Sequence, residues 1–360
     1  HNHQPANEDL QVFLCFLLRK TELLQLFNRI KKLCIFIEKF QRYSIMYKQT
    51  VNDYFLPSFL KSAPIKIALV AFIYNALAFI SYQITVTPDN IAPIYTAAGF
   101  ALASVLIMGR KTLIGIWIGS VVANLFSFWD TSQMLELPLI STILSAVLVA
   151  SGVTLGAALG AYFINLLNKG TYPLKTGWGV IIFLAISVFY SAICSLLGVS
   201  VISLFGLSAP NHFIFNWTTW WQGDFIGTII LTPFLTSWLY RYHIKIIATS
   251  LLEALALGLV TIFICVLVAF DHADDQYLLI IILLWATFRF RIRGVSIIAA
   301  LFALLSTIYG SLGYGSFAMT TPEASLTYIN SFFGLSTMIA LIMAGFYSDY
   351  LHKKLDKVNA

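Results

Sequence analysis

Long apolar runs separated by short polar linkers make up the chain from residue 65 onward. A helix needs roughly 20 apolar residues to cross about 30 Å of hydrocarbon. The pattern therefore predicts an all-α, polytopic membrane bundle of about ten transmembrane helices. The second, third and eighth runs are short, which predicts helices that are tilted, broken or re-entrant. The expected spans are 65–84, 92–109, 112–128, 137–166, 178–206, 217–240, 246–270, 276–290, 293–312 and 325–350.

The linkers between these runs alternate in charge. Short cytoplasmic loops collect Lys and Arg, so every second linker is expected to lie inside the cell. An even number of spans with basic flanks then places both termini in the cytoplasm. The basic linkers carry Arg110/Lys111, Lys169/Lys175, Arg241/Lys245, Arg289/Arg291/Arg293 and Lys353/Lys354/Lys357, whereas the acidic ones carry Asp89, Asp130/Glu136, Asp271/Asp274/Asp275 and Glu323.

The composition supports the same class of protein. Hydrophobic residues make up 59% of the chain and charged residues 11%, whereas soluble domains average about half and about a quarter. We therefore expect a multi-pass protein of the bacterial inner membrane. The net charge of +6 reflects the orientation of the protein in the membrane and contact with anionic lipids at the cytoplasmic face. We do not interpret it as a sign of nucleic-acid binding.

Three regions differ in character. Residues 1–63 mix basic and apolar side chains, which is typical of an interfacial amphipathic helix, although a poorly ordered extension remains the alternative. Residues 64–350 form the membrane domain. Beyond it, residues 351–360 continue an apolar spacing of three and four through Leu355 and Val358. That spacing suits either the start of a cytoplasmic coiled-coil connector or a frayed helix end.

The most specific motif is the stretch 217–227, which contains three tryptophans and Asp224. Tryptophans near the outer end of a span are typical interfacial anchors. An acid about two turns deeper is costly and must be paired, hydrated or protonated. We expect Asn124 and Gln222 to join it in an outward-facing pocket; the alternative is a carboxylate that sets helix register. The candidate sensing residues are Asp224, Asn124, Gln222, Trp217, Trp220 and Trp221.

Glu253 and Arg289 are expected at the same depth near the inner ends of two spans. Removing one partner would leave the other charge unpaired, so a structural ion pair is the preferred interpretation. Glycines four residues apart predict close helix packing. These are Gly115/Gly119, Gly152/Gly156/Gly160 and Gly223/Gly227.

Other chemistry is not indicated. The four cysteines, at 15, 34, 194 and 265, show no paired spacing and predict neither a disulfide nor a metal site. The acidic loop 271–275 is more simply a solvated surface loop than a cation site. No catalytic motif is recognisable, and no metal or cofactor is expected.

Three segments, 95–103, 220–227 and 284–290, resemble the membrane-associated sensor family called MASE, type one. The likeness covers roughly residues 65–350, and its specific part is the Trp-Trp-x-Gly-Asp-x-x-Gly element. The chain departs from the family pattern at Thr96, where proline is expected, and at Arg291, where glycine is expected. The resemblance implies an integral membrane input domain followed by a cytoplasmic diguanylate cyclase or histidine kinase.

The sequence therefore predicts a sensory input domain rather than an enzyme. A small ligand or membrane condition on the outer side would shift the last helix and so act on a fused or separate cytoplasmic signalling module. Dimerisation through that helix is a further expectation. The alternative is a secondary transporter, because buried acids and glycine-interrupted helices also suit a carrier.

Overall fold

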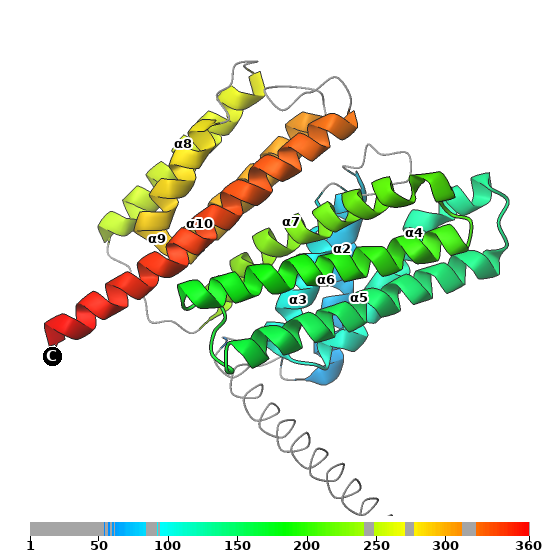
Figure 1. Ribbon diagram of the computed structural model, residues 1–360, viewed down its shortest axis with the longest axis horizontal. Coiled ribbons are helices and arrows are strands. Elements are labelled where there is room, and N and C mark those ends of the chain that lie inside the picture. Colours follow the sequence, from blue (N-terminus) through cyan, green and yellow to red (C-terminus); the bar gives the residue numbers. More distant parts are fainter. Residues whose placement is uncertain are drawn as a thin grey trace, which may run out of the picture. The chain divides into compact units, whose positions relative to one another are not determined.

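The computed structural model describes residues 54, 57, 60, 62–83, 92, 94–240, 248–270, 277–311 and 322–359 (Figure 1). All of them belong to one of two compact units, residues 49–360. The predictions for the amphipathic N-terminal segment, Cys15, Cys34, Asp89, the linker with Arg241 and Lys245, and the acidic loop lie outside the described residues.

The described part of the chain is helical, as the apolar pattern predicts. Among these residues, only the bridge between Tyr54 and Tyr240 has β character. The helices are α2 (Ala63–Gln83), α3 (Thr96–Met108), α4 (Thr112–Met134), α5 (Leu139–Leu167), α6 (Gly177–Leu204), the short 3-10 helix η2 (Pro210–His212), α7 (Phe213–Leu239), α8 (Ala248–Phe270), α9 (Leu278–Ser311) and α10 (Pro322–Asn359).

Six helices of the described chain are long and apolar enough to cross a membrane. They are α2, α4, α5 and α6, together with Leu251–Val268 of α8 and Asn330–Lys354 of α10. The third run was expected to be short, and that prediction is wrong, because α4 continues to Met134 for 23 residues. No proline lies between Thr112 and Leu137, so no residue of that kind breaks the helix where its polar end begins.

Helix α3 is short, with 13 residues, and lies at the centre of the packing. Every side chain from Ala97 to Ile107 is buried. Four of these residues are alanine and one is glycine, so neighbouring backbones can approach closely. The helix packs against α2, α4, α5 and α7. It therefore forms the core of the first six helices without needing membrane-spanning length.

The chain reverses direction within α9, at Arg291, whose φ is 54° and ψ −144°. A Cβ placed on Gly294 would lie 3.1 Å from the carbonyl oxygen of Ala286. In a straight helix, residues eight apart are separated by about 12 Å. The apolar runs 276–290 and 293–312, which the sequence separates, are thus two legs that fold back on each other.

Both legs of α9 pack on the same long helix. The ring of Tyr277, before the turn, lies 6.3 Å from that of Phe332 on α10. The ring of Phe302, after the turn, lies 6.2 Å from that of Phe333. Figure 1 shows α8, α9 and α10 running beside one another, and α10 also packs on α6 and α7.

The turn also explains the glycine that the family pattern places at position 291. A positive φ is unfavourable for residues with a Cβ and costs glycine nothing. The chain nevertheless carries arginine there.

Candidate functional site

The site is built around the crossing of α3 and α7, where two backbones touch. A Cβ on Gly99 would run into the carbonyl of Gly227, and one on Gly227 would run into the carbonyl of Tyr95. The hydroxyl of Thr232 donates to the carbonyl of Gly99 at 2.8 Å. Glycine at both positions is therefore a condition for this crossing.

Asp224 directly follows Gly223, whose backbone carbonyl takes part in the same crossing. The amide of Tyr95 donates to the carbonyl of Gly223 at 3.0 Å. Asp224 itself is 3% exposed, and its Oδ1 has no hydrogen-bond partner in the structure. The indole of Trp220, one turn earlier on α7, is the side chain within reach of the carboxyl. A buried carboxyl with so few donors is costly unless something else satisfies it.

Tyrosines from two helices lie near this carboxyl. Tyr74 of α2, Tyr82 of α2 and Tyr190 of α6 all interact electrostatically with Asp224, as does the thiol of Cys194. Tyr190 also donates to the carbonyl of Ala98 at 3.3 Å. The side chains that interact with this carboxyl in the described chain are therefore phenols, an indole and a thiol, all of them uncharged.

A chain of polar contacts leads from this position to Asn124. The hydroxyl of Tyr74 lies 3.4 Å from that of Tyr95 and donates to Ser120 Oγ at 3.4 Å. Asn124 in turn donates to the carbonyl of Ser120 at 2.7 Å. Its own Oδ1 is buried without a partner. Asn124 is thus linked through Ser120 and Tyr74 to Tyr95, whose backbone amide contacts α7 at Gly223, next to Asp224.

The tryptophans of the motif bind α7 to α6 and are only half-buried. Trp217 and Trp221 stack with ring centroids 6.3 Å apart. Their indole N–H groups donate to the carbonyls of Ala192 and Val188, both at 3.2 Å. The ring of Trp220 fills the space beside Gly198. These rings therefore hold two helices together, in addition to the interfacial anchoring expected from the sequence.

Gln222 is half-buried on α7. The predicted outward-facing pocket requires its amide to meet the carboxyl of Asp224 and the amide of Asn124. The described hydrogen bonds of Asn124 lead to Ser120, which Tyr74 joins to Tyr95.

Glu253 and Arg289 pair with each other, away from this network. The guanidinium of Arg289 donates to both carboxylate oxygens of Glu253. The indole of Trp285 donates to the same carboxylate at 3.1 Å. The side chain of Arg289 is 58% exposed on the surface of the protein, which is the surface that faces lipid or headgroups.

The other glycine pairs also lie at helix contacts. Gly115 and Gly119 of α4 meet Ile67 and Ala71 of α2, and Gly156 of α5 meets Cys194 of α6. A Cβ on Gly160 would lie 3.3 Å from the side chain of Leu102 of α3. Gly152 has only ordinary contacts at 3.6 Å with Leu197, so it leaves room for a methyl group.

Helix α10 touches both helices that hold the site. A Cβ on Gly334 of α10 would lie 2.6 Å from the side chain of Ile226, two residues after Asp224. Further along, Gly345 packs on Gly177 at the start of α6. There the carboxylate of Asp349 accepts a hydrogen bond of 2.9 Å from the amide of Gly177. A movement of α7 or α6 therefore meets α10 directly.

Sequence reasoning missed the tyrosines, Ser120 and Gly99 as members of the site. A signal was present, because tyrosine hydroxyls inside apolar spans need partners when buried. Which tyrosines share one network depends on how the helices cross, which no spacing within one helix reveals.

Comparison with known proteins identifies the family. No curated protein and no solved structure matches the chain. The family model MASE1 matches residues 66–350, which covers most of the chain and confirms the resemblance seen in the sequence. The chain therefore belongs to the MASE1 family of membrane sensory domains and is a multi-pass protein of the inner membrane.

Proposed function

We propose that the chain is the input domain of a signalling system, and that its stimulus is read at Asp224. The observation that carries this proposal is the buried carboxyl oxygen of Asp224 without a partner. A small ligand with a hydrogen-bond donor, or a proton, would satisfy that oxygen. Asn124 offers a second unpartnered oxygen in the same network, and Gln222 and the tryptophans Trp217, Trp220 and Trp221 form the flank of the site on α7.

The signal passes through α10 in this proposal. A stimulus can shift an equilibrium only if it binds one packing more tightly than another. Ile226 joins the Asp224 segment to Gly334 of α10, and Asp349 joins α10 to the start of α6. A small change in α7 would therefore change how α10 leaves the bundle, towards a cytoplasmic module of cyclase or kinase type.

Helix α10 has the length that such an output connection needs. Its 38 residues correspond to about 57 Å at 1.5 Å per residue, well beyond the roughly 30 Å of hydrocarbon. In the proposed arrangement, residues 64–350 form the sensor, residues 1–63 form a basic cytoplasmic extension and residues 351–360 begin the connector. A second copy of α10 is the expected dimer partner.

We further propose ten crossings with both termini in the cytoplasm. The reversal at Arg291 supports two crossings within α9. Basic side chains meet the carboxyl ends of two helices: Lys66 donates to the carbonyl of Met108 at 3.2 Å, and Arg293 donates to that of Ser237 at 2.8 Å. Anionic lipids of the cytoplasmic leaflet suit those ends.

The test measures how α10 responds to Asp224. Spin labels on cysteines at Thr171 and Lys354 would report the distance between the α5–α6 linker and the end of α10, with the four native cysteines replaced by alanine. Asp224→Asn keeps the shape of the side chain and adds a donor, so we expect a shifted distance distribution. Asp130→Asn is the matched control, because Asp130 is exposed at the outer end of α4. Identical distributions for wild type and Asp224→Asn would contradict the proposal.

The transporter alternative is less well supported. It relied on two buried acids, and Glu253 is held by Arg289 and Trp285, so its charge is already neutralised. Solute or proton uptake in proteoliposomes that depended on Asp224 would favour the carrier instead.

A further inference from the structure

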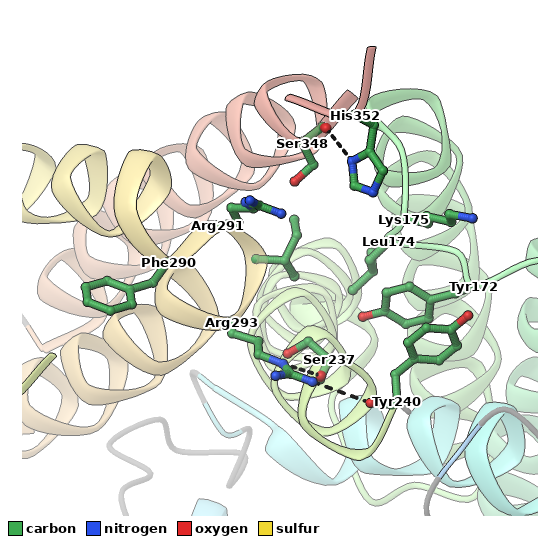
Figure 2. Close-up of a pocket in the computed structure, with 11 residues that line it drawn as sticks. Tyr172, Leu174, Lys175, Ser237, Tyr240, Phe290, Arg291, Arg293, Ser348 and His352 are labelled. Atoms are coloured by element: carbon green, nitrogen blue, oxygen red, sulfur yellow. Dashed lines mark hydrogen bonds between the residues drawn. The ribbon is translucent and has the colours of Figure 1, made fainter. Parts of the chain in front are cut away.

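A cavity of about 100 Å³ lies at the carboxyl end of α7 (Figure 2). Its lining residue Ser237 is about 20 Å along that helix from Asp224. Four segments surround it: the linker before α6, the end of α7, the turn of α9 and the last turns of α10. Its centre is apolar, with Leu174 and Ile292 in its wall. A space of this size holds several water molecules.

The first cation of the cavity is Arg293, which is held in position by neutral groups. Its Nε donates to the carbonyl of Ser237 at 2.8 Å, and its Nη2 lies 3.4 Å from the carbonyl of Tyr240. The guanidinium also lies 5.5 Å from the ring centre of Trp238. These contacts fix the side chain at the carboxyl end of α7 without cancelling its charge.

The second cation, Arg291, occupies a backbone conformation that favours glycine. Its φ of 54° places a Cβ where it is disfavoured. Residues kept in such conformations cluster at binding sites. Its side chain lines the cavity, as does that of Lys175. Within the described chain, neither of these two side chains has a hydrogen-bond or ion-pair partner.

The nearest acid on α10 does not neutralise this cluster. Asp349 directs its carboxylate to the amide of Gly177 at the start of α6. Hydroxyl donors face the cavity instead. Tyr172 is 8% exposed, and Figure 2 shows its hydroxyl directed towards the cavity. Burial raises the pKa of Tyr172, so its hydroxyl keeps its proton.

We propose that this cavity binds a phosphoryl group. Guanidinium groups match the oxygens of phosphate, and Arg291 and Arg293 with a tyrosine hydroxyl supply more donors than a single carboxylate uses. The apolar wall suits the carbon part of a phosphate ester. The source is either the headgroup of an anionic phospholipid or a soluble phosphate compound, because both present the same group.

Occupation of the cavity would also act on α10. Ser348 and His352 of α10 form one wall, and the ring of His352 lies 2.8 Å from the carbonyl of Ser348. A phosphoryl group held there ties the end of α10 to the turn of α9 and to the linker before α6. This site is separate from Asp224, so it stands or falls independently of the proposed function.

The experiment uses the full chain in nanodiscs and two probes. Inorganic phosphate is titrated at constant ionic strength in phosphatidylcholine nanodiscs, with thermal shift as the readout. Retention of phosphatidylglycerol from nanodiscs of equal phosphatidylcholine and phosphatidylglycerol is measured by native mass spectrometry. The variants are Arg291→Gln and Arg291→Gly, and Lys111→Gln is the control that removes one charge from the same end outside the cavity.

We expect at least one probe to bind, and Arg291→Gln to weaken that binding about tenfold or more, as loss of a charge-assisted contact does. Arg291→Gly should also lose binding while melting at or above the wild-type temperature, because glycine accepts the positive φ. Phosphate binding identifies a soluble ligand, and lipid retention alone identifies a headgroup. No binding of either probe, or equal effects of Arg291→Gln and Lys111→Gln, would overturn the proposal.

Discussion

The amide of Tyr95 donates a hydrogen bond of 3.0 Å to the carbonyl of Gly223, which ties the start of α3 to the residue before Asp224. Helix α3 begins at the next residue, Thr96. The end of a helix thus meets the middle of another at the position where the buried acid is held. This contact is possible because Gly99 and Gly227 let the two backbones meet.

Replacing Gly99 with alanine should destabilise the protein. The new Cβ would collide with the backbone carbonyl of Gly227, and overpacking of this kind typically costs about 1–3 kcal/mol. Thermal unfolding of the full chain in detergent measures the loss. Gly258→Ala is the control, since nothing lies within 4 Å of a Cβ there. Equal melting temperatures for the two variants would show that the crossing is looser than described.

Replacing Trp217 or Trp221 with phenylalanine should weaken the contact between α7 and α6. Each change keeps an aromatic ring, although a smaller one than the indole, and removes one N–H donor to a carbonyl of α6. Hydrogen bonds between membrane helices average about 0.6 kcal/mol, so the double variant should lose roughly twice as much as either single one. The exposed Trp129 provides the control variant Trp129→Phe. A double variant as stable as this control would argue against the two hydrogen bonds.

Glu253 and Arg289 should be coupled in a double-mutant cycle. Glu253→Gln leaves the arginine without its partner, and Arg289→Gln leaves the carboxylate with only the Trp285 donor. We expect both single variants to be less stable than the wild type. The double variant should lose less stability than the sum of the two single losses. The measurement is the unfolding midpoint of all four proteins under the same conditions. Simple additivity would mean that the pair contributes no interaction.

Asp349→Ala should loosen α10 from the start of α6. The carboxylate satisfies the otherwise free amide of Gly177, while the hydroxyl of Thr176 satisfies that of Gly179 at 3.0 Å. A carboxylate at a helix N-terminus typically contributes about 0.3–1 kcal/mol. Faster amide exchange in the first turn of α6, with little change elsewhere, is the expected result. Asp130→Ala serves as the control, and unchanged exchange at Gly177 would count against the cap.

Much of the architecture follows from local sequence. The apolar runs predicted the helices, including the two legs of α9 on either side of Arg291. Membrane class and family also follow from composition and from the Trp-Trp-x-Gly-Asp-x-x-Gly element. The length of α4 does not follow from local sequence. The span was expected to end before Asp130, whereas a helix ends only where the backbone conformation changes or a cap is formed.

The site could be predicted only in part. Asp224 was recognisable because an acid in an apolar run is costly wherever the run packs. Its tyrosine neighbours were not, since they come from other helices.

The sequence by itself determined that the chain is a multi-pass membrane protein built of apolar helices, because this depends on the transfer of contiguous side chains from water to lipid. Tertiary structure alone decided that Thr232 would bind the carbonyl of Gly99, 133 residues away, and that Arg291, Arg293 and Lys175 would surround one cavity. The physical reason is that an apolar helix face is accommodated equally well by lipid and by another helix. Which helices pack together therefore depends on close fit and on hydrogen bonds between them.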